Sequence, residues 1–188
     1  MSLVRMVCGL VLLAAAAPAI AADDIVDAID QARKAYQSGD LAAAKQSLDL
    51  ASQLVGQKNA EGFAALLPAP LSGWKADDAQ TSAIGQVGFG ASTASRTYNN
   101  DKGDRIEVTI TGDSAMIMQF ATLLANPAIA GAMGKITKIG NQRAIQTREG
   151  DIHIVAANKF LVTVNGSGDA ASKLAYAQAV NFDKLSKM

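Results

Sequence analysis

The residues that come closest to a catalytic set are Ser114, in the triplet Gly112-Asp113-Ser114, and His153, the single histidine of the chain. A serine hydroxyl becomes a nucleophile when a histidine accepts its proton and a carboxylate holds that histidine. Asp151 stands two positions before His153. The residue types needed for acyl transfer are therefore present, and their order decides whether they form a site.

The Gly-Asp-Ser triplet is similar to the nucleophile block of GDS-type esterases, which also follows a strand and opens a helix. This resemblance implies a serine hydrolase that uses Ser114 with His153. The family's G-x-N-D block is missing, however, and the histidine lies in D-x-H rather than D-x-x-H. Gly-Asp also precedes predicted helices at Gly39-Asp40 and Gly168-Asp169, where aspartate caps the first-turn amides. We therefore predict a helix cap at Asp113 and no enzyme, with the serine hydrolase as an alternative.

His153 belongs to the alternating segment Ile152-His153-Ile154. Alternate residues of a strand point to opposite faces, so a strand that buries the two isoleucines turns the histidine toward solvent. One histidine supplies a pH-sensitive charge or a single metal ligand, not a complete site. We predict an exposed strand residue here.

The methionines Met116, Met118 and Met133 suggest a soft-metal site, because thioether ligands favour Cu(I). Residues two apart on a helix point in directions about 200° apart, so Met116 and Met118 cannot converge on one ion. Methionine more commonly fills gaps in an apolar core. We predict core methionines and no metal site.

Three further segments could bind an ion or a phosphate, and each has a simpler structural explanation. Asn99–Asp104 superficially resembles a calcium loop, but its glycine occupies a ligand position and the twelfth-position glutamate is missing, so we predict a hairpin turn. Gly85, Gly88 and Gly90 do not follow the order of a phosphate-binding loop. A basic group predicts a solvated sheet face, with weak attraction of anions as the alternative. It comprises Lys135, Lys138, Arg143, Arg148 and Lys159.

The 188-residue chain is electrically balanced, with 17 Lys plus Arg against 17 Asp plus Glu. Nucleic acids and anionic lipid surfaces both call for a basic excess, so neither is an expected partner. Residues 1–21 have the order of a secretory signal peptide: Arg5, an apolar stretch from Met6 to Ala17, and Ala19-Ile20-Ala21 as the cleavage site. The apolar stretch is shorter than a membrane-spanning helix requires.

Cleavage near Ala21 removes Cys8, the only cysteine. The remaining chain then has no disulfide, thiolate nucleophile, zinc–thiolate site or c-type haem attachment. An exported chain without cysteine is more typical of a bacterial periplasm than of eukaryotic secretion. We predict a periplasmic protein without a cofactor and without a transmembrane span after cleavage.

Residues 22–58 predict a helical hairpin, because apolar residues recur at helical spacing on both sides of a break at Ser38-Gly39-Asp40. The two apolar stripes comprise Ile25, Ile29, Ala32 and Tyr36, then Leu41, Ala44, Leu48, Ala51 and Val55. The pattern resembles a single tetratricopeptide repeat, with no second copy at the family's period of about 34 residues. We expect an Ala-rich hairpin docked on the main domain, with a partner-binding repeat as the alternative.

Residues 59–72 predict a linker or short helix, which Pro68-Ala69-Pro70 ends. In 73–188, Ile106, Val108 and Ile110 alternate with polar residues, as in a half-buried strand over 105–111. Short turns separate the other predicted strands and favour antiparallel neighbours. These strands are 91–98, 136–139, 144–147, 152–156 and 160–164, with helices at about 114–125 and 169–180. The predicted fold class is α+β, an antiparallel β-sheet flanked by helices and preceded by the α-helical hairpin.

The order of these elements resembles the PsbP-like fold family over about residues 70–185. The points of similarity are Pro70-Leu71-Ser72-Gly73-Trp74, the strand at 105–111, Ile139-Gly140 before the strand at Ala144, the hairpin at 152–164 and the closing helix. The resemblance implies a non-enzymatic module that docks on partners. It supplies no shared catalytic residue.

Residues 114–134 carry no charge. Pro127, Gly131 and Gly134 make this segment unsuitable as one spanning helix. The helix at 114–125 has more apolar surface than the covering of a sheet requires, and we expect the hairpin to cover the excess, with a partner protein or the membrane surface as alternatives.

The predicted function is an exported periplasmic, non-catalytic binding or assembly protein. Its expected partner is another envelope protein or a small ligand. Association with the membrane surface through 114–134 is one alternative and the serine hydrolase is the other.

Overall fold

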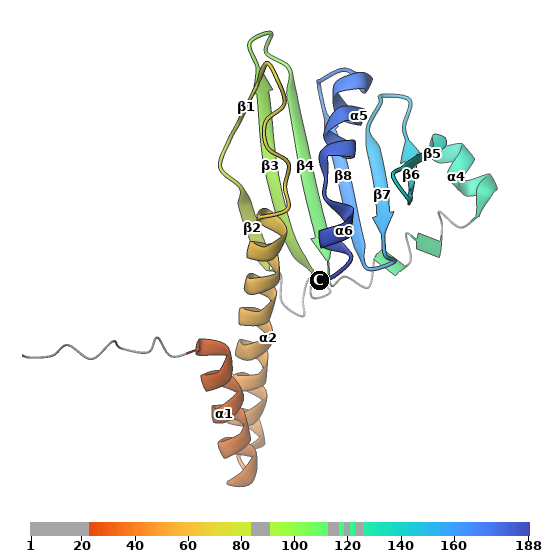
Figure 1. Ribbon diagram of the computed structural model, residues 1–188. Coiled ribbons are helices and arrows are strands. Elements are labelled where there is room, and N and C mark those ends of the chain that lie inside the picture. Colours follow the sequence, from red (N-terminus) through yellow and green to blue (C-terminus); the bar gives the residue numbers. More distant parts are fainter. Residues whose placement is uncertain (1–22, 84–90, 113–116, 119–120, 123–125) are drawn as a thin grey trace, which may run out of the picture.

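The computed structural model describes residues 23–83, 91–112, 117–118, 121–122 and 126–188. The described part begins with a helical hairpin, α1 (Asp24–Gln37) and α2 (Leu41–Ala64), and continues into an antiparallel sheet with helices beside it (Figure 1). The strands are β1 (Trp74–Ala76), β2 (Gln80–Ala83), β3 (Ser92–Asn100), β4 (Arg105–Gly112), β5 (Lys135–Ile139), β6 (Gln142–Gln146), β7 (Ile152–Ala156) and β8 (Phe160–Gly166). The later helices are α4 (Pro127–Met133), α5 (Ala170–Ala179) and α6 (Phe182–Leu185). The predicted α+β class is confirmed.

The described strands form one eight-stranded sheet in the order β1-β3-β4-β8-β7-β6-β5, and β2 pairs with β3 beside β1. Every pairing among the described strands is antiparallel, as the short connections predicted. The strand β4 shows why the sheet has a buried face: Ile106, Val108 and Ile110 are fully buried, while the residues between them are polar. The predicted alternation over 105–111 is confirmed.

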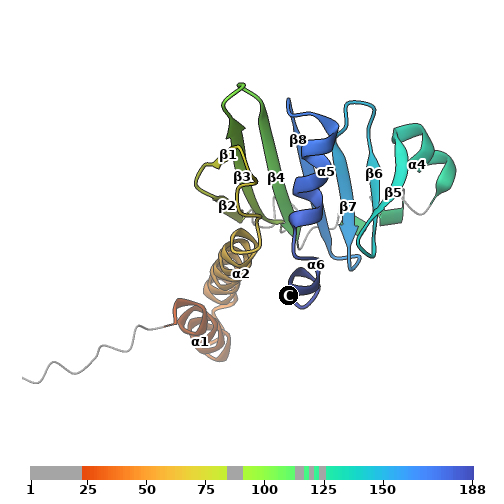
Figure 2. The ribbon, with the colours of Figure 1, turned by 45° about the horizontal axis from the view of Figure 1, so that its top comes forward.

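The main core lies on the face of the sheet that α5 covers (Figure 2). It contains Ile154, Val162 and Tyr176, with Phe63 from the end of α2. The opposite face carries a smaller cluster, in which Ala130 and the partly buried Ala121 pack on Ile145, Val155 and Leu161. The two clusters use alternate residues of the same strands, which is the consequence of strand geometry.

Phe63 joins the hairpin to the sheet. Its ring packs edge to face on Phe160, with 5.6 Å between ring centroids. A Cβ at Gly112 would lie 2.5 Å from the Phe63 Cζ, so only glycine lets the ring approach β4 so closely. The aromatic ring thus fixes the C-terminal end of α2 on the sheet.

The hairpin is held together by small residues. Ala28 and Ala32 of α1 are buried, as are Ala44 and Ala51 of α2. The Asp40 carboxylate caps α2 by accepting from the Ala43 amide at 2.9 Å. The corresponding cap at Asp169 accepts from the Ser172 amide at 2.7 Å, and this hydrogen bond lowers the pKa of Asp169. Two of the three predicted aspartate caps are confirmed, and Asp113 lies outside the described residues.

The two predicted apolar stripes are only partly buried in the hairpin. The alanines of the two stripes are buried, but Ile29, Tyr36 and Leu48 are exposed, as are Leu41 and Val55. Close packing of two helices through alanines leaves no room for larger side chains between them, so these side chains point outward.

The hairpin does not cover the described part of the helix predicted at 114–125. The C-terminal half of α2 packs against β2 and β3, and Phe63 belongs to the main core. Ala121 packs on the opposite face of the sheet. Most of the other residues of this predicted helix lie outside the described residues.

Four short elements were missed by the sequence reasoning: β1, β2, α4 and α6. The strand β2, Gln-Thr-Ser-Ala, has no apolar alternation because it is an edge segment exposed on most positions. The helix α4 begins at a proline, which tolerates the first helical turn. In addition, α2 extends through residue 58, where we expected a boundary, to Ala64.

Candidate binding surface on the helical hairpin

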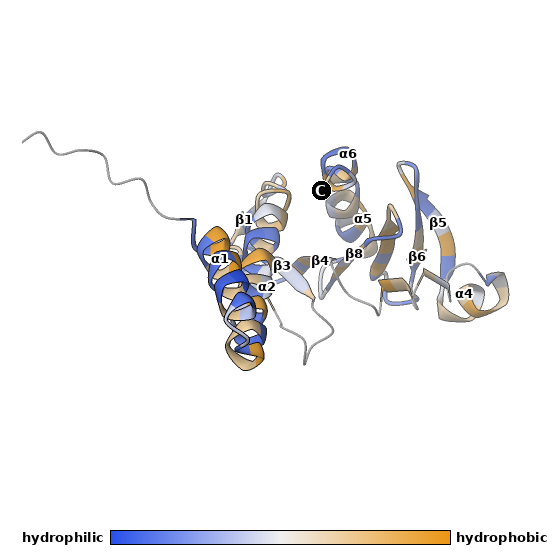
Figure 3. Ribbon diagram, turned by 90° about the horizontal axis from the view of Figure 1, so that it is seen from below, coloured by the Kyte–Doolittle hydropathy of each residue, from blue (hydrophilic) through white to orange (hydrophobic). Residues whose placement is uncertain are grey.

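The hairpin carries most of the exposed large apolar side chains of the described chain. Seven of the twelve belong to α1 and α2, although the strands of the sheet contain more large apolar residues than these two helices. They are Val26, Ile29, Tyr36, Leu41, Leu48, Leu50 and Val55. Figure 3 shows apolar stretches along both hairpin helices. A concentrated exposed apolar surface is typical of an interaction site.

Six of these seven residues share one face. Val26, Ile29 and Tyr36 lie within an arc of about 80° on α1, at about 100° per residue. Leu41, Leu48 and Val55 lie within about 40° on α2 by the same geometry. Around each helix axis, the centre of the arc lies about 50–90° from the alanines that pack between the helices. Because the two helices are antiparallel, these two rotations bring both arcs to the same side of the hairpin. We call these six residues the apolar face.

Leu50 lies on the other side of the hairpin. It lines a shallow cavity of about 320 Å³ together with Leu54 of α2 and with Asp24, Asp27 and Gln31 of α1. None of the residues of the apolar face lines this cavity. The two faces of the hairpin therefore differ in chemistry: one is apolar, and the other combines two leucines with acidic and amide side chains.

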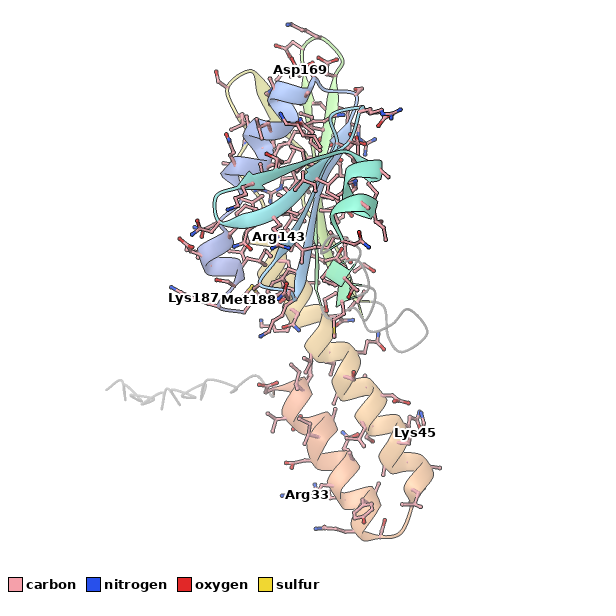
Figure 4. All side chains as sticks on the ribbon, turned by 90° about the vertical axis from the view of Figure 1, so that its right-hand side faces the viewer. Arg33, Lys45, Arg143, Asp169, Lys187 and Met188 are labelled. Atoms are coloured by element: carbon pink, nitrogen blue, oxygen red, sulfur yellow. The ribbon has the colours of Figure 1, made fainter. Side chains whose placement is uncertain are left out.

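Two ion pairs lie along the outer sides of the apolar face. By the same helical geometry Asp30, Lys45 and Asp49 lie just outside the arcs, whereas Arg33 lies within the arc on α1. On α1 the Arg33 guanidinium lies 3.1 Å from the Asp30 carboxylate, and on α2 the Lys45 ammonium lies 2.7 Å from the Asp49 carboxylate. Both cations lie in the half of the hairpin farther from the sheet (Figure 4). All four side chains are largely exposed, so these pairs contribute little stability within the chain.

The hydrolase candidate is only partly described. Ser114 and Asp113 lie outside the described residues. His153 points to the face opposite the main core, between Ile145 and Thr163 of the neighbouring strands, but it is half-buried rather than exposed as predicted. Burial lowers the pKa of His153, and the nearby Asp151 carboxylate opposes that change. A neutral histidine can accept a proton, but Ser114, the residue that it would have to activate, lies outside the described residues.

Asp151 is engaged elsewhere. Its carboxylate binds the Lys173 ammonium of α5 at 2.6 Å, and that ammonium also donates to the Glu149 carbonyl at 2.9 Å. The Lys173 side chain is only 3% exposed. Sequence reasoning missed this pair because no local pattern connects residues 151 and 173. It joins α5 to the start of β7 and so has a structural role.

The described methionines do not fill the core. Met118 is exposed, and Met133 is exposed at the end of α4, so the predicted core role is wrong for both. The neighbouring residue Ile117 is buried in place of Met118. Met116 lies outside the described residues.

The remaining candidates are structural. Asn99–Asp104 forms the predicted hairpin turn, in which the Gly103 amide donates to the Asn100 carbonyl and Gly103 has φ +86°. Gly85, Gly88 and Gly90 lie outside the described residues. All five side chains of the basic group are exposed, as predicted, but Arg148 and Lys159 lie in turns, so the group is not a single sheet face.

Two shallow cavities adjoin the turn between β5 and β6. One, of about 490 Å³, is lined by amide groups of that turn and of the segment between α5 and α6, and the other, of about 530 Å³, by the turn and by Arg143 and Asn158. The Gln142 side chain accepts a hydrogen bond from the Ala157 amide at 3.4 Å, which connects the start of β6 to the turn between β7 and β8. Amide side chains supply hydrogen-bond donors and acceptors to both cavities, while the Asp183 carboxylate lines the first and the Arg143 guanidinium the second.

Within the described ranges, no helix is long and apolar enough to cross a membrane. The same residues contain no group of three or more His, Cys, Asp or Glu side chains arranged to hold a metal ion. Comparison with known proteins found no matching family model, no matching curated protein and no matching solved structure. The resemblance to the PsbP-like fold family remains a prediction.

Proposed function

We propose that this chain is an exported periplasmic protein without catalytic activity, and that it binds or assembles other envelope proteins through its helical hairpin. The apolar face carries this proposal. Six large apolar side chains lie on one side of a hairpin that projects from the sheet (Figure 1), and each remains 43–69% exposed in the described chain. Surfaces of this kind lower their free energy when a partner covers them.

The chemistry of the sheet domain supports a scaffold role. Most of its large apolar residues are buried, apart from those around α4 and β5 and at Met188, and both members of the Lys173–Asp151 ion pair are satisfied. Phe63 packs in its main core and so attaches the hairpin to the sheet domain at one end.

The test places a photoreactive amino acid at position 48 in one variant and at position 50 in another. Both positions are exposed leucines of α2, but only Leu48 belongs to the apolar face. On illumination of intact cells, we expect protein adducts from position 48 and few from position 50. Equal yields from the two positions, or no adducts from either, would contradict the docking role.

A second candidate function, association with the membrane surface, is favoured by a smaller apolar patch. Ile129, Met133 and Ile136 are exposed on α4 and the edge strand β5, next to the exposed lysines Lys135 and Lys138. This patch lies at the edge of the sheet away from the hairpin (Figure 2).

Flotation with vesicles that contain anionic lipid tests this candidate. If the patch contacts membranes, the wild-type chain floats and Ile136→Glu reduces the floating fraction several-fold, while Leu48→Glu has no effect. If the chain stays at the bottom of the gradient, the membrane role is wrong.

A further inference from the structure

We infer that the apolar face is occupied by a second copy of this chain, and that the two hairpins pair with the tip of one beside the base of the other. This inference rests on the proposed docking role of the hairpin and names its partner. The arrangement places α1 on α1 and α2 on α2 of the partner copy. Every neighbouring pair of helices in the resulting four-helix bundle is then antiparallel, which is favourable for the helix dipoles.

The apolar face is suited to its own copy. Its residues lie in a row along each helix. Ile29 lies near the middle of α1, and Leu48 lies midway between Leu41 and Val55 on α2. A two-fold axis perpendicular to the helices, level with about residues 30–31 of α1 and 47–48 of α2, brings Val26 of one copy close to the level of Tyr36 of the other and Leu41 close to the level of Val55. A self-complementary patch of this kind is what a two-fold interface needs.

The flanking ion pairs favour this orientation over the other two-fold pairing. With tip beside base, Arg33 of one copy comes level with Asp30 of the other, and Lys45 comes level with Asp49. If the tips instead lay together, with α1 on α2 of the partner copy, Arg33 would face Lys45 and Asp30 would face Asp49. Like charges would then meet at both edges of the interface, which is unfavourable.

The hairpin has room for a second copy, but the interface is small. The helix α1 has 14 residues and is about 21 Å long, and a pair of helices is about 20 Å wide, so each copy contributes roughly 400 Å². The total is below the roughly 1,200 Å² of a stable interface. We therefore expect a reversible dimer that forms above a concentration on the order of 10 µM.

The first experiment measures the mass of the exported, purified chain by sedimentation over a range of concentrations. We expect a monomer–dimer equilibrium for the wild type, a shift to monomer for Leu48→Glu and no shift for Leu50→Glu. Leu48 and Leu50 are matched, because both are exposed leucines two positions apart on α2, 55% and 46% exposed. Circular dichroism of each variant checks that the hairpin remains helical.

The second experiment tests the charges. The variant Arg33→Asp/Lys45→Asp makes both edges acidic, and Asp30→Lys/Asp49→Lys makes both basic. We expect each variant alone to be monomeric and an equimolar mixture of the two to associate. Association of either variant alone as tightly as the wild type would overturn the role of the edges.

The third experiment tests the orientation. With tip beside base, the two Ser38 positions are far apart, so Ser38→Cys forms no disulfide-linked dimer under mild oxidation. A Ser38→Cys dimer that forms readily would show that the tips lie together and would overturn the proposed pairing.

The outcomes separate this inference from the proposed function. A wild type that stays monomeric at its highest soluble concentration overturns self-pairing. Adducts of position 48 with a different envelope protein would then still support the docking role. Adducts of position 48 that contain two copies of the chain support self-pairing and the use of the hairpin as a docking surface.

Discussion

The sheet domain and the hairpin use apolar residues in opposite ways. In the central strands of the sheet, the large side chains are buried, as in Ile106 and Ile154, although the edge strand β5 exposes Ile136. In the hairpin, alanines are buried between the helices and the large side chains are exposed. Burial of apolar area is the main stabilising contribution, at about 25 cal/mol per Å², and an alanine offers little area. The sheet is therefore built to be stable by itself, whereas the hairpin is built to gain stability from contact.

The largest expected effect tests this contrast directly. Ile154 is fully buried in the main core, so Ile154→Ala should lower the free energy of unfolding by about 3–4 kcal/mol. Leu48→Ala, on the exposed face, should change it by less than about 0.5 kcal/mol at concentrations where the chain is monomeric. Urea denaturation of both variants measures the two values. A loss at Leu48 as large as that at Ile154 would break the comparison.

The buried ion pair extends the contrast to charged residues. Asp151→Asn leaves the Lys173 ammonium without its carboxylate partner, and we expect a loss of about 2–4 kcal/mol. The surface pair Lys45–Asp49 should lose less than about 1 kcal/mol on Asp49→Asn. The double variant Asp151→Asn/Lys173→Met removes both buried charges and should recover much of the loss. Equal losses in the single and double variants would show that the uncompensated ammonium is not the cause.

A substitution at the junction asks whether the two regions are independent. Gly112→Val places side-chain atoms where the Phe63 ring lies, and we expect a loss of about 1–3 kcal/mol. Hydrogen exchange should accelerate in the last turns of α2 more than in β7 or β8. Gly131→Ala is the control, because no atom lies within 4 Å of the added Cβ and alanine favours the helix α4 by up to about 1 kcal/mol. Uniform acceleration across the sheet would mean that the regions unfold together.

The smallest expected effect is a pH dependence. Burial raises the pKa of Tyr98 from 10.0 to about 12, and its hydroxyl donates to the Pro68 carbonyl at 2.6 Å. The folded chain retains this proton at pH values where the unfolded chain releases it. The stability that Tyr98 contributes is therefore complete below pH 10 and is lost as the pH rises from 10 through about 12.

The control for this prediction is Tyr98→Phe, which lacks the titrating group and the hydrogen bond. Its stability should lie about 1 kcal/mol below the wild type at neutral pH. The gap should close as the pH rises through the range from 10 to about 12. A gap that stays constant would show that the hydroxyl is not protected by the fold.

The sheet was predictable where the residues alternate. Ile106, Val108 and Ile110 define β4 because one face of the strand is buried and the other is polar. The strand β2 was not predictable, since its conformation comes from pairing with β3 rather than from its own residues. Pairing partners far apart in the sequence leave no local pattern.

The binding surface was only half predictable. Helical spacing indicates which hairpin residues lie in line, such as Leu41, Leu48 and Val55, but not whether the line faces the other helix or solvent. That choice depends on the close packing of Ala44 against α1, a property of both helices together. Exposure of the apolar face therefore emerges only from the folded hairpin.

The attachment of α2 to the sheet has a mechanical consequence. Beyond Phe63, the Pro68 carbonyl accepts from both Tyr98 and Arg96, and the Leu71 amide donates to the Tyr176 hydroxyl, so the chain is clamped where α2 leaves the sheet. The C-terminal half of α2 packs on β2 and β3, so the part of the helix that projects freely, residues 41–55, is about 22 Å long. Over this length, a rotation of about 10° would displace the tip of the hairpin by about 4 Å. A small change in the packing of Phe63 at Gly112 would therefore be amplified at the far end of the hairpin.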